Sequence, residues 1–369
     1  MKSSALLETR RVRILLMLLL SGAILLLSFL TEKSIHDVKE SGGSPIRIIG
    51  KQNFPLREIS GMYMFPESTG KVRQVYLIGD AHGILGIANW DGQSLTDYRL
   101  IDFSQSMTEA WGLCSGTQVT GCQEHLRFIT SQWEAVTSDA SRKAFLLHEQ
   151  LGTIFVIDPE SQEISSLISL ESFSIGQDKK TRLSQHHQKK LKNAMGEGLL
   201  LLKNGHILVA KERGDPALIE FGPEGSDSVG YHKELWVADT AVFPIPERKN
   251  RLFPLKIWRL PERLKSCDMS ELGVDKEGSL LVLSQSCGWI SRLNSLLPED
   301  SFLSFKEMWS LPGELRKAEA FVIPEAGMFL VAEDQESSSV MNVFVLSSGM
   351  EATMPVATAL HKQGLLSEN

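Results

Sequence analysis

The sequence predicts an all-β protein of the β-propeller class, preceded by one N-terminal transmembrane helix. Three observations lead to this: one long apolar run near the N-terminus, many short apolar segments after residue 45, and a pattern of strands that occurs five times. Short strands separated by Gly, Asp, Pro and Ser are typical of sandwiches, barrels and propellers. With 369 residues, of which 42% are hydrophobic, the chain can bury one large core or two small ones.

The apolar run Ile14–Leu30 is the predicted transmembrane helix. Its seventeen residues carry no charge and nine of them are leucine. A helix of this length spans roughly 26 Å, close to the ~30 Å hydrocarbon core of a bilayer. Three arginines precede it within residues 10–13, and the charges of Glu32 and Lys33 after it cancel. The positive-inside rule therefore predicts a cytoplasmic segment 1–13 and an extracytoplasmic remainder.

A cleaved secretory signal is the alternative for the same run. Such a signal usually has an apolar region of about 7–15 residues and a small-x-small cleavage site. The exit of this run, Ser28–Thr31, fits that site poorly. Both interpretations export the rest of the chain, which we divide into a linker (31–44), a propeller (45–348) and a C-terminal tail (349–369).

Charge and cysteine content limit the partners and the compartment. A net charge of −7 without a basic stripe argues against a nucleic-acid partner. The four cysteines form two pairs by proximity, Cys114 with Cys122 and Cys267 with Cys287, and neither spacing matches a zinc ribbon or a CxxC site. In an oxidising compartment an even count favours disulfides, so two structural disulfides are predicted.

Five segments share one pattern: a short strand that opens with a small or acidic triplet, a very apolar second strand, a polar stop and a third strand. The predicted second strands are Val75–Ile78, Ala144–Leu147, His206–Ala210, Ser279–Leu283 and Met328–Ala332. The predicted third strands are Ile84–Ile87, Thr153–Asp158, Ala217–Phe221, Trp289–Leu293 and Asn342–Leu346. A unit this small must stack on its neighbours to bury both faces, which is how propeller blades pack.

The number of blades depends on whether the insertions between the units contain strands of their own. The units are separated by insertions, among them Lys179–Lys192 and Pro223–Arg263. Strand-like pieces in the second insertion (235–238 and 255–260) favour a degenerate sixth blade, with five blades as the alternative. Ile46–Ile49 is predicted to supply the outer strand of the last blade and so close the ring, which removes the sheet edges.

Polar residues recur at two points of the repeat and predict two rings of carboxylates. The first series, at the start of the first strand, is Ser60, Glu134, Glu197, Glu271 and Glu319. The second series, at the end of the second strand, is Asp80, Glu149, Glu212, Gln285 and Glu333. In the last four units the two positions are 14 or 15 residues apart, and in the first they are 20 apart. An antiparallel pair of strands then brings both series to the same end of the propeller axis.

Gathered carboxylates raise each other's pKa or recruit a cation. Oxygen ligands without clustered His or Cys favour calcium or magnesium over zinc. The candidate metal ligands are Glu134, Glu197, Glu212, Glu271, Glu319, Glu149, Glu333 and Asp80, with calcium as the candidate cofactor. Two alternatives remain: structural hydrogen bonds from these acids to neighbouring blades, and a catalytic role. His82, His148 and His206 are weaker candidates for a general base, and packing is the simpler role for them.

These residues resemble the six-bladed propellers of the SdiA-regulated and esterase-like phytase group. The resemblance lies in Trp133-Glu134-Ala135, in Gly196-Glu197-Gly198, in Ile207–Pro216 with its Ala-Lys-Glu-Arg, and in Leu281–Ser284. It implies an exported propeller with a polar central channel, of a group in which some members are described as calcium-binding or hydrolytic. Glu134, Glu197 and Glu212 match the group pattern best. Phytase activity is not implied.

Three functions follow from this interpretation. The first is a membrane-anchored propeller that binds a small molecule or a protein at its channel face, with calcium as a candidate ion. The second is an extracytoplasmic hydrolase of esters in which a metal polarises the substrate. The third is a scaffold of an envelope assembly. Propellers host all three, so the fold alone does not choose among them.

Overall fold

The computed structural model describes residues 44–66, 72–80, 83–110, 130–171, 196–212, 215–237, 240–245, 251–315, 317–333 and 341–347. The chain divides into two compact units, Met1–Gly43 and Ser44–Asn369, and the description concerns the second. The predicted membrane helix Ile14–Leu30, the cysteine pair Cys114–Cys122, His82 and the C-terminal tail lie outside the described residues. Within them, no helix has the length and apolar character needed to cross a membrane.

The described strands form five antiparallel meanders of four strands each. The first contains β3 (Ile59–Met64), β4 (Arg73–Gly79), β5 (Ile84–Trp90) and β6 (Leu95–Asp102). The second contains β7 (Trp133–Ser138), β8 (Ala144–His148), β9 (Thr153–Asp158) and β10 (Glu163–Leu170). The third contains β11 (Gly198–Leu201), β12 (Ile207–Lys211), β13 (Ala217–Gly222) and β14 (Arg251–Arg259). The fourth contains β15 (Glu271–Val274), β16 (Leu280–Ser284), β17 (Trp289–Leu293) and β18 (Phe305–Ser310). The fifth contains β19 (Ala318–Glu325), β20 (Met328–Glu333), β21 (Met341–Ser347) and β2 (Arg47–Phe54).

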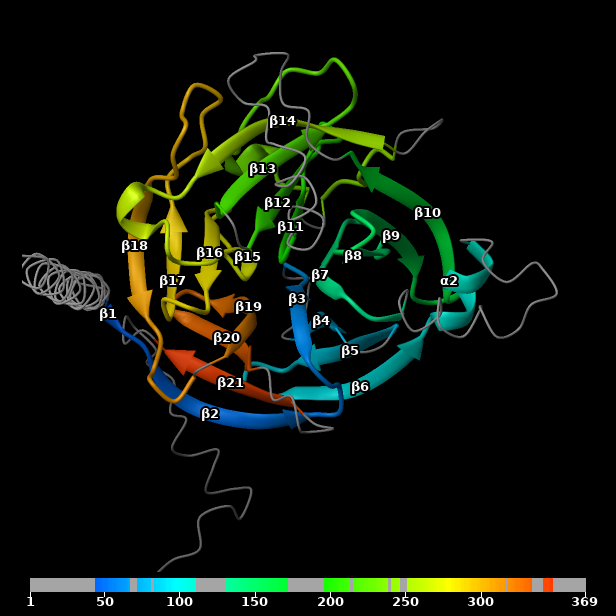
Figure 1. Cartoon of the computed structure of the whole chain (residues 1–369). Helices are drawn as coiled ribbons and strands as arrows, with labels where there is room; N and C mark the ends of the chain where they lie inside the picture. The colour runs from blue at the N-terminus through cyan, green and yellow to red at the C-terminus, as the bar shows by residue number, and fades with distance from the viewer. Residues whose placement is uncertain are drawn as a thin grey trace, which may run out of the picture. The chain divides into compact units, whose positions relative to one another are not determined.

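The first strand of each meander lies innermost, and these strands contact one another in the order β3, β7, β11, β15, β19 and back to β3. Figure 1 shows the sheets radiating from this centre. The arrangement is a β-propeller, as the sequence predicts. Two short pairings join neighbouring sheets at their outer edges: β10 runs parallel to β14, and β1 (Ser44–Pro45) runs parallel to β18. The remaining short elements are α2 (Ser104–Ala110) and the 3-10 turns η1 (Lys233–Leu235) and η2 (Glu262–Leu264).

The ring closes where the sequence predicts. Strand β2, which contains most of Ile46–Ile49, pairs antiparallel with β21 from the other end of the chain. The fifth sheet therefore combines one strand from the start of the propeller with three from its end. This pairing covers the outer edge of β21 and removes one exposed sheet edge.

The insertion Pro223–Arg263 does not form a sheet of its own among the described residues. Its second strand-like piece lies in β14, which pairs with β13 and completes the third meander. The first piece lies at η1 and at Trp236, which bridges to Leu202. Residues that the sequence offers to a sixth blade are therefore used by the third sheet, because its β13 would otherwise lack an outer partner.

The inner strands approach so closely that glycine is required at their contacts. A Cβ at Gly61 would lie 2.8 Å from Ala135 Cα of the next meander, and a Cβ at Gly198 would lie 2.5 Å from Leu272 N. Such contacts are with backbone that cannot move aside. A cavity of about 40 Å³ on the axis is lined by residues of all five inner strands. This volume is close to the roughly 30 Å³ that one water molecule takes up in the liquid. The axis is packed rather than open, so chemistry is available at its ends.

Apolar side chains fill the spaces between successive sheets. All residues of β8 and β16 are buried, as expected for strands covered on both faces. Each core cluster combines neighbouring meanders, for example Phe145 and Leu147 of the second with Leu199 and Val209 of the third. Stacking of sheets, rather than any single sheet, therefore buries the core.

Candidate functional site at one end of the axis

Every inner strand carries one extra residue at the same point, a β-bulge. In the first, second and fifth meanders the register shifts between Ile59 and Gly61, between Trp133 and Ala135, and between Ala318 and Ala320. In the third meander, Gly198 pairs with Ala210, and the N–H of Glu197 donates to the carbonyl of the same Ala210. In the fourth, Glu271 pairs with Leu283, and the N–H of Ser270 donates to the carbonyl of the same Leu283. The bulge residues are Ser60, Glu134, Glu197, Ser270 and Glu319. A bulge re-aims a side chain that would otherwise alternate between the two faces of the sheet.

This register corrects one member of the first predicted series. The fourth unit places Ser270, not Glu271, in the bulge. A shift of one residue along a strand turns the side chain to the other face. Glu271 is only 1% exposed, and its carboxylate accepts hydrogen bonds from Leu272 N (2.8 Å) and from Met62 N of β3 (3.2 Å). Since β3 and β15 are not neighbours in the ring, Glu271 pins two inner strands across the axis.

The second predicted series follows an equally regular rule. The residue that follows each bulge pairs with a residue of the second strand. Two positions after that partner lies the member of the second series, which is Asp80, Glu149, Glu212 or Gln285 in the first four meanders. In the fifth meander Glu333 pairs with Ala318, one position too early. The position that the rule gives in the fifth meander lies outside the described residues. We call Asp80, Glu149, Glu212 and Gln285 the rim residues.

Six of the eight predicted acids influence each other electrostatically. Burial, and then the charges of Asp80, Glu149, Glu319 and Glu212, raise the pKa of Glu134 well above its usual range. Burial, and then Glu134, Glu212, Glu149 and Glu319, do the same to the pKa of Glu197. We call Glu134, Glu197, Glu319, Asp80, Glu149 and Glu212 the axial acid cluster.

Hydrogen bonds between neighbouring meanders hold part of this cluster. Gln285 Nε2 donates to Glu319 Oε1 of the next meander (2.7 Å), and Asp80 Oδ1 accepts from Gln132 N just before β7 (2.6 Å). Ser60 Oγ donates to the carbonyl of Trp133. The structural role that the sequence offered as an alternative therefore applies to Asp80 and Glu319.

A disulfide fixes the fourth meander at this same end. Cys267 and Cys287 are joined, as predicted. Asp268, next to Cys267 in the chain, accepts hydrogen bonds from Ser284 Oγ (2.8 Å) and Ser286 N (2.9 Å). Bulge residue Ser270 and rim residue Gln285 are bonded through Gln285 N and Ser270 Oγ (3.2 Å), so the disulfide and Asp268 hold both in place.

The described part of the cluster does not form a ready metal-binding shell. Nowhere in residues 44–347, outside the gaps given above, do three His, Cys, Asp or Glu side chains lie close enough together to hold a metal ion directly. The arrangement suits a cationic group that donates hydrogen bonds to several separated carboxylates, either directly or through water.

Of the three histidines that the sequence offers as a general base, His148 and His206 are described, and each is buried against a partner in its own meander. His148 is fully buried against Trp133, with ring centroids 5.1 Å apart. His206 is paired with buried Glu220 in the third meander (Nδ1 to Oε1, 2.6 Å).

Lys211 is a further titratable residue beside the axial acid cluster, in addition to the predicted metal ligands. It is 4% exposed, directly precedes Glu212, and donates from Nζ to the carbonyl of Asp215 (3.2 Å). Burial lowers the pKa of its ammonium group to about 8, although Asp215 and Glu212 oppose this shift.

Comparison with known proteins shows weak structural similarity only. No family model matches the chain, and no curated protein matches it. Among solved structures, the chain is similar to virginiamycin B lyase from Staphylococcus aureus, with 10% identity, 85% of this chain and 76% of that chain covered, and a TM-score of 0.34. It is also similar to a luciferin-regenerating enzyme (9% identity, 81% and 95% covered, TM-score 0.39). A third is the nidogen/laminin complex (14% identity, 74% and 72% covered, TM-score 0.36). At these identities and scores no activity is transferred, and the resemblance to the SdiA-regulated and phytase group stays a prediction.

Proposed function

We propose that the chain is a membrane-anchored, extracytoplasmic β-propeller of five blades that binds a cationic ligand or partner at the acidic end of its axis. The feature that carries the proposal is the axial acid cluster, in which burial, and then the charges of neighbouring carboxylates, raise the pKa of half-buried Glu134 and of buried Glu197. A site that holds several like charges together gains free energy when a cation neutralises them.

Five blades are supported by the ring of inner-strand contacts, which returns to β3 after β19. The bulge occurs once in each meander, the rim position is described in the first four, and Gln285–Glu319 links one blade to the next. The close approaches at Gly61 and Gly198 also suit a small ring, because few inner strands leave little space on the axis.

An extracytoplasmic location is supported by the disulfide and by the leading apolar run. Structural disulfides persist in oxidising compartments and are rare in the cytosol. The run Ile14–Leu30 with its preceding arginines would export the domain as an anchor.

Calcium is the inorganic cation that an all-oxygen site favours. Glu134, Glu197, Glu149 and Glu212 would hold it, with water between the ion and some carboxylates, since no direct shell is formed in the described residues. An organic ammonium or guanidinium group would reach the same carboxylates by hydrogen bonds.

The test is thermal unfolding of the exported domain with calcium chloride, magnesium chloride or putrescine, against sodium chloride of equal ionic strength. One of these cations is expected to raise Tm, because a ligand at 100 times its Kd stabilises by about 2.7 kcal/mol. Glu197→Gln should abolish the rise, whereas Glu163→Gln, an exposed glutamate on β10, should leave it intact. Equal responses in wild type and Glu197→Gln would contradict the proposal.

A hydrolase is the second candidate, favoured by the raised pKa of Glu134 and Glu197. A carboxyl that keeps its proton near neutral pH can act as a general acid, while an ionised neighbour acts as a base. We expect that, if the domain hydrolyses p-nitrophenyl acetate, Glu212→Gln lowers the rate by 100-fold or more, the usual contribution of roughly 10²–10⁴ from general acid–base catalysis. Turnover unchanged by Glu212→Gln would exclude the cluster as its origin. An envelope scaffold is the function that remains if neither cation binding nor hydrolysis is found.

A further inference from the structure

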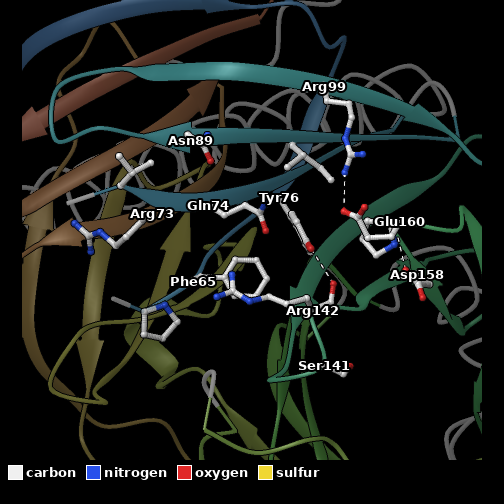
Figure 2. A pocket seen from close by; sticks show the side chains of 14 residues that line it. Phe65, Arg73, Gln74, Tyr76, Asn89, Arg99, Ser141, Arg142, Asp158 and Glu160 are labelled. Carbon is white, nitrogen blue, oxygen red and sulfur yellow. Dashed lines mark hydrogen bonds and ion pairs between the residues drawn. The ribbon is translucent and has the colours of Figure 1, made fainter. Parts of the chain in front are cut away.

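A second cavity lies between the first and second meanders, away from the axial acid cluster. Its volume is about 440 Å³, within the range of roughly 300–1,000 Å³ that small-molecule sites have. It is bordered by the β7–β8 turn with Ser141 and Arg142, and by the β9–β10 turn with Pro159 and Glu160. These turns lie at the opposite ends of the strands from Glu134 and Glu149. Figure 2 shows the side chains around the cavity.

Charge around the cavity is positive in a chain that is negative overall. Arg73, Arg99 and Arg142 line it together with Asp158 and Glu160, an excess of one positive charge, whereas the whole chain carries −7. The two acids are already engaged: Glu160 pairs with Arg99 (3.3 Å), and Asp158 Oδ1 accepts from Glu160 N (2.9 Å). An anionic guest would therefore be attracted rather than repelled.

Arg142 is the positive charge that remains available. Its guanidinium lies 4.0 Å from the centre of the Phe65 ring, across the boundary between the two meanders. No carboxylate lies within 4.0 Å of this guanidinium among the described residues. Stacking on Phe65 holds the guanidinium plane in place while its N–H edges stay free to donate. Figure 2 shows Arg142 beside Phe65 and below Tyr76, whose hydroxyl donates to the Arg142 carbonyl (2.8 Å).

The backbone at Arg142 is strained to place this side chain. Its φ is +62°, a left-handed conformation that costs an L residue other than glycine or asparagine roughly 1–2 kcal/mol. The turn is fixed by Arg142 N donating to Asp139 O (3.0 Å) and by Ser141 N donating to Asp139 Oδ1 (2.9 Å). Glycine would adopt this turn without strain, but it would lack the guanidinium that stacks on Phe65. Strained residues of this kind cluster at ligand sites.

We propose that this cavity binds a small organic monocarboxylate with an apolar or aromatic body. The carboxylate accepts hydrogen bonds from the edge of the Arg142 guanidinium, the geometry in which arginine binds carboxylates in pairs of N–H···O bonds. The body of the ligand lies against Tyr76 and Ile87, which line the same cavity. A single anionic group matches the excess of one positive charge, and an apolar body matches the aromatic wall.

The test is titration of the wild-type domain with benzoate and, as a neutral match of the same shape, benzamide, followed by calorimetry. Hexanoate serves as an aliphatic monocarboxylate and inorganic phosphate as a compact anion. We expect saturable binding of benzoate or hexanoate, at least about tenfold tighter than benzamide, since hydrogen bonds to a charged group contribute roughly 1.5–3 kcal/mol.

Two variants separate binding from folding. Arg142→Gly should lower benzoate affinity at least about tenfold and leave Tm unchanged or higher, because it relieves the left-handed strain. Gln162→Gly relieves the same strain at φ +61° in the neighbouring turn and should leave affinity unchanged. Absence of saturable binding by both carboxylates, equal affinity of Arg142→Gly, or phosphate binding as tight as benzoate would each overturn the proposal. None of these outcomes bears on the cation site at the axis.

Discussion

Replacing Glu220 by alanine is expected to destabilise the propeller by about 3–5 kcal/mol, the cost of breaking a buried charged pair. The carboxylate is completely buried between the third sheet and the loop that follows it. It bonds to His206 Nδ1 (2.6 Å) and accepts from Val229 N (3.0 Å), from Gly230 N (3.1 Å) and from the hydroxyl of Ser228. Four polar groups lose their partner together when the carboxylate is removed.

The loop that Glu220 holds lies between β13 and β14 of the third meander and contacts the β17–β18 connection of the fourth. Gly230 approaches so closely that a Cβ there would lie 2.0 Å from Leu296 O, and Tyr231 and Leu296 exchange both backbone hydrogen bonds. Losing Glu220 should therefore loosen one blade-to-blade junction. Urea unfolding measures the change, with Glu224→Ala, an exposed acid of the same loop, as a control expected within about 0.5 kcal/mol of wild type. A loss below about 1 kcal/mol in Glu220→Ala would show that water or another group takes over these contacts.

Glu220 also makes the free energy of unfolding depend on pH in the acid range. Burial raises its pKa, but hydrogen bonds from His206, Ser228, Val229 and Gly230 outweigh burial, and the net pKa is lowered. A lowered folded-state pKa means that its contribution is complete above the unfolded value, near 4.3 for Glu, and is lost as pH falls through the folded value. This loss should be absent from the acid unfolding curve of Glu220→Ala.

Much of the fold could be predicted from the sequence because strands buried on both faces leave a strong local signal. The predicted second and third strands of all five units coincide with observed strands, and Ile46–Ile49 lies largely in β2, which closes the ring. The strand-like piece at 255–260 was predicted as a strand, but its partner was not, because local sequence identifies a strand without identifying what it pairs with, and here the partner is β13.

The site prediction was limited by register, which local sequence encodes weakly. The triplet Ser270-Glu271-Leu272 resembles Trp133-Glu134-Ala135 with glutamate in the middle, yet the bulge lies at Ser270. A uniform spacing was the available signal. Glu134 to Glu149 and Glu197 to Glu212 span 15 residues, as do Ser270 to Gln285 and Glu319 to Asp334 in the sequence. The pairs chosen from residue type in the last two units, Glu271 with Gln285 and Glu319 with Glu333, span 14.

Other features depend on contacts that no local pattern contains. The Arg142 cavity joins the turn after β7 to Phe65 and Tyr76 of the preceding meander, and the Glu220 network joins a strand residue to a loop that follows it. Each requires knowledge of which surfaces meet. The left-handed backbone at Arg142, like the bulges, is visible only in three dimensions.

The axial acid cluster should make the free energy of unfolding fall as pH rises, whereas the contribution of Glu220 falls as pH decreases. Burial and neighbouring carboxylates raise the pKa of Glu134 and of Glu197 in the folded state. A raised folded-state pKa means that the contribution of these carboxyls is complete below their unfolded value, near 4.3, and is lost as pH rises through the folded value. The loss is about 1.4 kcal/mol for each unit by which one folded-state pKa exceeds the unfolded one. Unfolding free energies measured from pH 5 to pH 9 should therefore decline in cation-free buffer.

Glutamine at both positions should flatten this decline, because it keeps the shape and polarity of the carboxyl and cannot ionise. The double variant Glu134→Gln/Glu197→Gln is expected to be more stable than wild type at pH 9 and nearly equal to it at pH 5. Glu271→Gln is the informative comparison: burial also raises the pKa of Glu271, but no other carboxylate contributes. A cation that binds the axial acid cluster should restore wild-type stability at pH 9 and leave the double variant unchanged. If the double variant declined as steeply as wild type, the charges at the axis would be paired already, and the basis for cation binding there would be lost.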